Sequence, residues 1–404
     1  INIQYQKNML KLNATNKSIF LQVFVVILLL LGLYLLRFNT LENLESQGKS
    51  LGFTFLSDTS GFSILPTFGT WVMDYKVGES TYVDVFIVGI LNTIIVGIFG
   101  IIAATILGFL IGIFRLSDNI VLKWFSAIYV EIFRNIPLLL WLFIVYFAVL
   151  RNLPDKRDAV FLLNQSFGLN ITGFYAPSPI FLNNFWFVFI GFVFVIFGVY
   201  FFSKWAKKRF ILTGKRLPVL WINLFLIFLV PIFIYYLLDK PLSWNFPEFK
   251  SDGPVLKRGF QSGMGMMIVP EMIAVWAALS LYTSSFIAEI VRSGILAINK
   301  GQSEASSALG LKKGTTLRLI IIPQALRVII PPLTSQYLNL IKNSSLSVAI
   351  AYPELVSTFG GTALNQVGKE VEMIFMLMLV YLFFSILTSA FMNWFNAKIK
   401  LTER

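Results

Sequence analysis

The side chains that most often carry out covalent or metal-dependent chemistry are missing from this sequence. It contains no cysteine and no histidine, which excludes disulfides, thiolate nucleophiles, histidine-based triads and metal sites built from histidine or cysteine. A nucleotide-binding loop would read Gly, four residues, then Gly-Lys-Ser or Gly-Lys-Thr. The nearest approach begins at Gly361, but six residues precede Gly368, and Glu370 replaces the magnesium-binding hydroxyl. We therefore predict no catalytic residue, no metal and no cofactor, although carboxylate chemistry stays open.

Polar side chains that could contact a solute gather near one interrupted hydrophobic run. Pro331 and Pro332 remove backbone donors there and bend the helix, and small polar residues follow where the helix must end. Broken helices are tolerated in a membrane only where they face protein or a cavity. Asparagine and serine offer donors and acceptors, which suits a zwitterion. We predict a polar pathway, with a structural turn between two spans as the alternative, from Asn92, Thr93, Asn339, Asn343, Ser344 and Ser345.

One charged pair lies near the end of a hydrophobic run. Glu289 and Arg292 are three residues apart, so they share a helix face. A charge in the middle of a bilayer costs about 2.5–3.5 kcal/mol on insertion scales, and we therefore place the pair at the cytoplasmic end of its span. We predict a structural ion pair. It either braces the loop at 300–314 or is an ordinary interfacial pair worth less than about 1 kcal/mol.

A polar segment rich in small residues, 300–323, separates two hydrophobic runs. Its basic residues indicate that it faces water on the cytoplasmic side; they are Lys300, Lys312, Lys313 and Arg318. Ala305 and the small residues after it would let another backbone or a groove approach closely. We interpret the segment as a docking site for a soluble partner, although an interfacial loop without a partner fits the composition equally well.

Local signals within this segment predict two short helices and a turn. Gly310 is expected to take the left-handed conformation that ends a helix. Thr315 or Thr316 is expected to cap the second helix, and Pro323 to end or kink it at the membrane surface. The result would be a rigid, exposed protrusion held by the flanking spans.

The spacing of the segment resembles the EAA loop of bacterial ABC importer permeases, which reads Glu-Ala-Ala, three residues, Gly, nine residues, Ile-x-Leu-Pro. Glu304, Ala305, Gly310 and Pro323 fall in this register, whereas Ser306 replaces the second alanine. Flanking motifs resemble the polar amino-acid uptake subfamily; they begin at Phe286, Pro323 and Lys342. The resemblance implies that the four matching residues couple the chain to an ABC ATPase, which is a separate subunit.

The elements that position these residues are long apolar runs. The chain is 57% hydrophobic and only 13% charged, whereas soluble domains carry about 25% charged residues. Only helices or closed barrels satisfy the backbone inside lipid, and these runs lack the alternation of barrel strands. We predict an all-α polytopic integral membrane protein with about eight transmembrane helices, the first a retained anchor, at roughly 19–36, 84–114, 124–150, 184–203, 219–238, 270–291, 324–345 and 371–396.

The distribution of charge sets the expected orientation. The net charge is +13, and with eight spans the excess of lysine and arginine falls on one side. By the positive-inside rule that side is cytoplasmic and holds both termini. A basic patch for nucleic acid would lie in a soluble domain, so we predict a multi-pass membrane protein in contact with lipid and not with nucleic acid. The resemblance implies that this membrane is a bacterial inner membrane.

The resemblance covers two blocks, about 84–150 and 270–398, which together supply the five spans of a permease core. The loops on the outer side are rich in Gly, Pro, Ser, Asn and Asp and are expected to form turns and irregular surface. The predicted division is an anchor with an outer loop, the first part of the core, an insertion with two spans, and the second part of the core with the coupling loop 300–323; the boundaries are 1–83, 84–150, 151–268 and 269–404.

The resemblance implies a permease subunit of an ABC importer that moves polar or general L-amino acids into the cytoplasm by alternating access. It further implies ABC ATPase subunits, a periplasmic amino-acid-binding protein and a second permease subunit, which we expect to be a different chain. An ion-coupled secondary transporter is the alternative, but it would need buried carboxylates within the spans. An integral-membrane enzyme is a weaker one, suggested only by the charged loop at 151–158.

Overall fold

The computed structural model describes residues 2–46, 51–163, 165–215, 217–252, 254–255, 258–261 and 263–399. Within these ranges seven helices are long and apolar enough to cross a membrane, or up to eight if a bent pair counts as one span. The prediction of a polytopic helical membrane protein with about eight spans is therefore confirmed, although the fold is mostly helical and not strictly all-α, because it also contains short strands.

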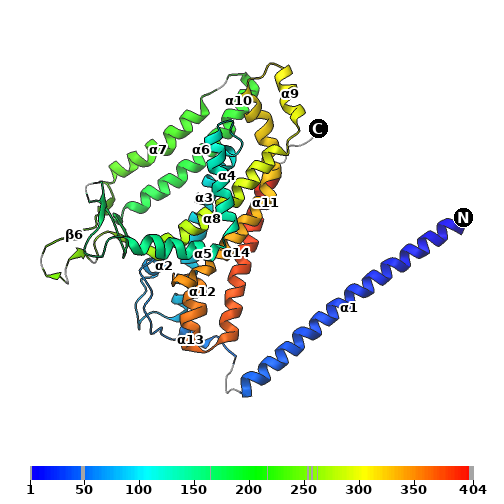
Figure 1. The fold of residues 1–404 in the computed structure, drawn as a ribbon. Coiled ribbons are helices and arrows are strands. Elements are labelled where there is room, and N and C mark those ends of the chain that lie inside the picture. The colour runs from blue at the N-terminus through cyan, green and yellow to red at the C-terminus, as the bar shows by residue number, and fades with distance from the viewer. Residues whose placement is uncertain are drawn as a thin grey trace.

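Helix α1 (Asn2–Ser46) stands apart from the remaining helices (Figure 1). None of the most apolar part of its Ser18–Asn43 stretch is buried inside the chain. A helix that is hydrophobic on all sides needs an apolar surrounding on all sides. By length and composition this stretch can cross a membrane, and its role as an anchor stays a prediction.

Helices α3 (Tyr82–Phe114) and α8 (Pro270–Leu296) form the centre of the core. They approach closely because glycines of α3 face α8. A Cβ added at Gly108 would lie 2.6 Å from the Cβ of Ile287, and one at Gly112 would lie 2.8 Å from the carbonyl oxygen of Ala288. Small residues allow such approach in a membrane, where lipid provides no hydrophobic force between helices.

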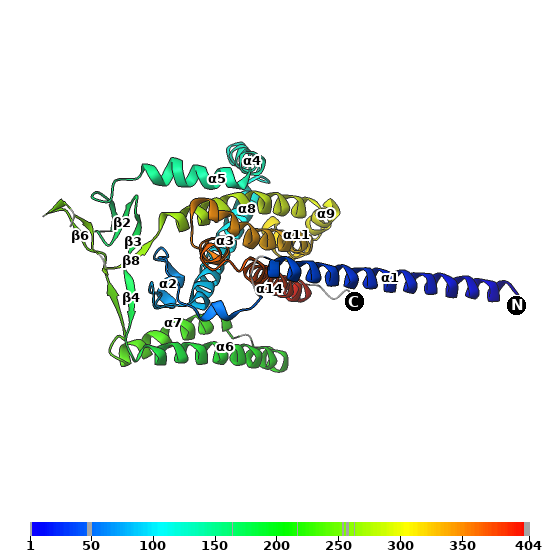
Figure 2. The ribbon, with the colours of Figure 1, turned by 90° about the horizontal axis from the view of Figure 1, so that it is seen from below.

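The apolar run at 124–150 forms two helical segments instead of one continuous span. Helices α4 (Ile120–Asn135) and α5 (Leu138–Phe143, continued by helical turns to Asn152) meet at an angle of 105°. Pro137 disfavours the helical conformation of the preceding residue, and Ile136 has an extended ψ of 131°. In Figure 2, α4 is seen nearly end-on while α5 lies across the view.

The last third of the chain wraps around α8. Helix α11 (Ile322–Asn343) packs against both α8 and α14 (Glu370–Ile399). Between α11 and α14 the chain makes short helical turns, namely a 3₁₀ segment Ser344–Ile350, α12 (Leu355–Ser357), a π-helical segment Thr358–Ala363 and α13 (Leu364–Val367). Another short helix, α2 (Phe68–Val72), packs against α3.

The segment between α5 and α8 contains a helical hairpin and small antiparallel sheets. The expectation of irregular turns was wrong here, because strands from both sides of the hairpin α6 (Phe185–Thr213) and α7 (Val219–Leu237) pair with each other. Strand β3 pairs with β8, and β4 with β5. The strands are β1 (Val160–Leu162), β2 (Phe167–Asn170), β3 (Gly173–Ala176), β4 (Ser178–Phe181), β5 (Leu242–Asn245), β6 (Phe249–Lys250), β7 (Gly259–Phe260) and β8 (Met266–Ile268).

The sheets and the segment after α8 lie at opposite ends of the molecule. Figures 1 and 2 both place the strands at one end, and α9 (Lys300–Ala308) together with the α6–α7 turn toward the other. Strand β8 is followed almost directly by α8, which runs to the end that carries α9. The core helices therefore connect the two ends physically.

Candidate functional site

Helix α9 is a short, exposed protrusion between α8 and α11. The Asn299 side chain caps it by accepting a hydrogen bond of 2.9 Å from the Gly301 N–H, which satisfies one free donor at the start of the helix. Gly310 follows the helix with a φ of +72°, so its predicted left-handed conformation is confirmed. Glu304 and Ala305 are exposed, whereas Ser306 is buried.

The second helix of this segment differs from the prediction at both ends. Helix α10 (Lys313–Thr316) begins after Lys312, so neither Thr315 nor Thr316 caps it, and both lie inside it. Of the two outcomes predicted for Pro323, an end or a kink of the helix, the end is wrong. A π-helical segment, Leu317–Ile321, precedes it, and α11 continues beyond the proline to Asn343. The wider π turn accommodates a proline that has no N–H to donate.

The protrusion also presents an apolar side chain that the sequence reasoning did not single out. Leu309, at the C-terminal end of α9, is 79% exposed. The Gln324 side chain donates a hydrogen bond of 3.3 Å to that of Gln302 and so links α11 to α9. The exposed residues Glu304, Ala305 and Leu309 can thus contact another protein, while both neighbouring helices hold α9 in place.

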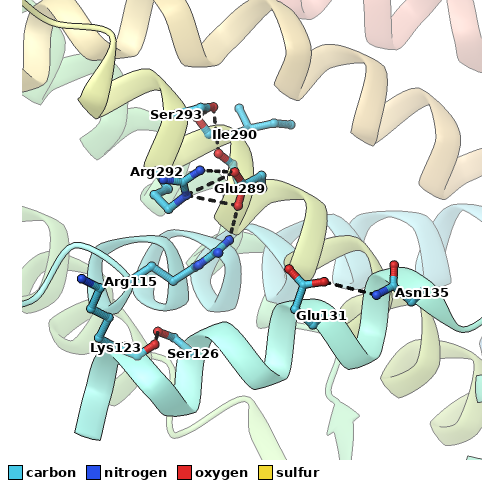
Figure 3. Close-up of polar contacts among 9 residues, drawn as sticks. All are labelled: Arg115, Lys123, Ser126, Glu131, Asn135, Glu289, Ile290, Arg292 and Ser293. Carbon is cyan, nitrogen blue, oxygen red and sulfur yellow. Dashed lines mark hydrogen bonds and ion pairs between the residues drawn. The ribbon is translucent and has the colours of Figure 1, made fainter. Parts of the chain in front are cut away.

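The carboxylate of Glu289 lies between two arginines (Figure 3). Arg292 Nη2 lies 2.6 Å from Glu289 Oε1, and Arg115 at the end of α3 pairs with Glu289 Oε2. The guanidinium of Arg134 from α4 lies 5.3 Å from the ring centroid of Phe286 on α8. Sequence reasoning paired Glu289 with Arg292 but missed Arg115, although its position directly after a long apolar run was a signal. The cluster joins α3 to α8 close to α9.

Asn92 is buried in a polar lock between three segments. Its Oδ1 accepts a hydrogen bond of 2.9 Å from the Gly69 N–H, and its Nδ2 donates to Thr67 Oγ1 at 2.9 Å and to the Pro353 carbonyl at 2.7 Å. Its exposed fraction is 0%. These bonds hold α2 and the turn before α12 against α3.

Glu354 lies beside this lock and was not among the predicted residues. It is completely buried and accepts hydrogen bonds of 2.8 Å from the N–H groups of Val356 and Ser357, and one of 3.1 Å from the Tyr381 hydroxyl. Burial raises the pKa of the Glu354 carboxyl to about 7, although these three donors partly oppose the rise. The only signal in the sequence was its place after Pro353, where a carboxylate can cap a helix start.

The predicted pathway residues fall into two groups in the structure. Asn92, Thr93 and Ser344 are buried, and Thr93 Oγ1 accepts a hydrogen bond of 3.2 Å from the Leu355 N–H near Glu354. The others lie along α11 and just after it, with Asn339 exposed and both Asn343 and Ser345 half-buried. The Ser345 hydroxyl bonds to the backbone carbonyl of Lys342 at 2.7 Å.

The exposed face of α11 is polar over its second half. Ser335, Asn339 and Lys342 are all exposed and recur at intervals of four and three residues, which places them on one helix face. Polar and ionisable groups inside a membrane almost always face protein or a water-filled cavity. The geometry can therefore provide one wall of a polar passage.

Comparison with known proteins agrees with this arrangement. Residues 188–401 match the family model of the inner membrane component of binding-protein-dependent transport systems. The chain is 44% identical over 388 residues to the General L-amino acid transport system permease protein AapQ of Rhizobium johnstonii, covering 96% of this chain and 93% of that relative. It is 45% identical over 395 residues to the putative amino-acid ABC transporter permease protein YhdX of Escherichia coli, covering 97% and 96%.

A third relative is the Glutamate/glutamine/aspartate/asparagine transport system permease protein BztB of Rhodobacter capsulatus, 37% identical over 430 residues that cover 99% of this chain and 97% of that one. The family match begins at residue 188, inside the segment 151–268 that the sequence reasoning set apart from the core. The likeness to these relatives extends over nearly the whole chain. The chain therefore belongs to the family of inner membrane permease components of binding-protein-dependent ABC transport systems.

Proposed function

We propose that this permease moves polar or general L-amino acids into the cytoplasm, driven by ABC ATPase subunits that dock on α9. The names of the three relatives support the substrate class, since all three refer to amino acids. The exposure of Glu304 and Ala305 on α9 supports the docking site. The proposal depends on this observation more than on any other.

Motion at α9 would reach the spans through both of its ends. Helix α8 leads into α9, and α11 is bonded to it through Gln324. The pairing of Glu289 with Arg115 extends the connection to α3. An ATPase that pulls on α9 would therefore move α3, α8 and α11 together, which provides the rigid-body rocking required for alternating access.

The polar face of α11 would line the passage at the boundary with a second permease subunit. Ser335, Asn339 and Lys342 need a polar surrounding, and a second subunit across a water-filled passage provides it. We infer a heterodimer of two different permease chains, fed by a periplasmic amino-acid-binding protein. Asn339 and Asn343 would contact the amino acid at modest strength, so that it can also be released.

Both termini would lie in the cytoplasm. The C-terminal end of α14 lies toward the same end as α9 in Figures 1 and 2, and the basic residues around α9 favour the inner side. We further propose that the spans of α3 to α5, α8, α11 and α14 form the permease core and that 151–268 is an insertion.

A paired substitution tests the docking site. Ala305→Asp with Gly310→Asp adds charge to the docking face, and the second change also places a side chain at a positive φ. We expect loss of ATP-driven uptake and of ATPase co-purification, with normal membrane insertion. Asn119→Asp serves as the control, because it adds a negative charge outside the docking face, one where the double variant adds two, and aspartate still caps α4.

Normal uptake by the doubly substituted chain would show that α9 is not the coupling site. The same assay separates an ABC importer from an ion-coupled transporter. We expect uptake to survive collapse of the ion gradient and to stop when ATP is depleted, and the reverse result would support the ion-coupled alternative.

A further inference from the structure

The end of α6 and the residues that follow it, 204–215, carry a concentration of positive charge that the transport mechanism does not use; we call this segment the basic turn. Its basic residues are all exposed; they are Lys204, Lys207, Lys208, Arg209 and Lys215. The sequence contains no aspartate or glutamate from 159 to 238. The charges therefore have no acidic partner on their own hairpin.

Helix α6 is long enough to carry most of these charges beyond the hydrocarbon region. It has 29 residues, whereas about 20 helical residues cross a bilayer core. Lys204 begins the last ten residues of the helix, so this part lies at the level of the lipid headgroups if the apolar stretch before it spans the core. Figures 1 and 2 both place this turn toward the end that holds α9.

Aromatic rings hold two of the cations at this level. Lys204 Nζ lies 4.6 Å from the ring centroid of Tyr200, and the guanidinium of Arg209 lies 5.4 Å from that of Trp205. Tyrosine and tryptophan are typical of the membrane–water interface. Nearby, Asn223 Nδ2 donates a hydrogen bond of 2.9 Å to Ser203 Oγ and so fixes α7 against α6.

A shallow, open apolar groove begins next to the basic turn and lies between side chains of α7 alone. Its lining consists only of apolar side chains, namely Trp221, Leu224, Phe225, Phe228, Leu229 and Ile232. Trp221 is the third residue of α7, so the groove starts at the end of the helix that carries the charges. No residue of α7 is buried, and this face is therefore open to the membrane.

We propose that the α6–α7 hairpin binds an anionic phospholipid, with its headgroup on the basic turn and an acyl chain in the groove of α7. The positive-inside rule accounts for basic residues at this end, but not for an apolar groove that continues from them. Clusters of four to eight lysines and arginines beside a membrane helix are typical of sites for anionic headgroups. A free phosphate would use only the charges.

The test uses the purified transporter with its partner subunits in detergent. Phosphatidylglycerol and phosphatidylcholine with identical acyl chains are added separately, and lipid retention is measured by native mass spectrometry. We expect the intact protein to retain phosphatidylglycerol preferentially. The triple variant Lys204→Gln, Lys207→Gln, Lys208→Gln should weaken retention about a hundredfold, since each charge near an anionic surface contributes about fivefold.

Two controls separate the roles of charge and groove. Arginine at the same three positions should preserve retention. Phe225→Ala with Phe228→Ala should weaken retention of phosphatidylglycerol but leave the binding of inorganic phosphate unchanged. Because the chain has no cysteine, Thr213→Cys can be labelled alone with a membrane-impermeant reagent to verify that the hairpin keeps its orientation in each variant.

Equal retention of the two lipids by the intact protein would overturn the proposal. So would undiminished retention by the triple glutamine variant with a correctly oriented hairpin. If that variant inverts the hairpin, the salt dependence of the intact protein decides, because retention of phosphatidylglycerol must fall steeply with ionic strength. Retention of phosphatidylglycerol that does not change with salt would contradict a headgroup site. If inorganic phosphate displaces the lipid and the Phe225→Ala, Phe228→Ala variant retains the lipid as well as the intact protein does, the basic turn is a phosphate site and the groove has no role.

Discussion

Replacing Asn92 with alanine is expected to destabilise the transporter more than it changes the affinity for the transported solute. The substitution leaves two buried backbone groups without a partner, the Gly69 N–H and the Pro353 carbonyl. Thr67 retains the hydrogen bonds of its capping box. An unsatisfied buried group costs about 1–3 kcal/mol, so two of them should cost about 2–6 kcal/mol.

The assay compares two variants by stability and by uptake. Thermal stability is read from the loss of the monodisperse gel-filtration peak after heating, and uptake is measured in vesicles at matched expression. Asn92→Ala should lower the melting temperature by several degrees. Asn339→Ala is the matched control, because Asn339 is exposed and makes no side-chain hydrogen bond within the described residues.

We expect Asn339→Ala to keep the stability of the unmodified protein and to alter the apparent substrate affinity or rate. The reasoning would be refuted if Asn92→Ala kept its melting temperature and changed the substrate affinity instead. That outcome would mean that Asn92 faces the solute and that its three hydrogen bonds do not support the fold.

Three further outcomes are expected. Gly108→Val should lower thermal stability strongly, because its Cβ would lie 2.6 Å from Ile287. Gly198→Val is the control and should be close to neutral, because position 198 has open space around it. Equal effects of the two substitutions would contradict the close packing of α3 and α8. Leu309→Ala should weaken co-purification of the ATPase without lowering expression, and undiminished co-purification would remove this side chain from the docking surface. The pKa of Glu354 is raised from 4.5 to about 7, so the folded state holds its proton more tightly than the unfolded state. Stability should therefore fall as the pH rises from about 4.5 through 7. Glu354→Gln should reduce the decrease of melting temperature over this pH range. An unchanged pH dependence in this variant would mean that another group causes it.

The sequence was a good guide to the helices because composition and local conformation decide them. Long apolar runs can be satisfied in lipid only as helices, and Gly310 ends α9 as its freedom at positive φ suggested. Pro323 was predicted to end or kink its helix, but a π-helical segment precedes it and the helix continues past the proline. A single residue in the sequence gives no sign of such a segment. Pro137 did carry a signal for the break between α4 and α5 that the apolar run concealed.

The sheets and the polar lock could not be inferred because they join distant segments. Tyr175 of β3 pairs with Met267 of β8 across the whole α6–α7 hairpin, and strands of two to four residues leave almost no pattern of their own. Asn92 has the same chemistry whether it faces a solute or the fold. Its partners lie 23 to 261 residues away in the chain, so only the structure reveals that its hydrogen bonds are already used.

Cross-linking from α9 tests the central claim most directly. The chain has no cysteine, so Ala305→Cys can carry a single photoreactive probe in the assembled transporter. We predict labelling from the cytoplasmic side only, and a cross-link to the ATPase subunit whose yield changes when ATP binds. Labelling from the outer side, or no cross-link to an ATPase in an actively transporting complex, would contradict the account.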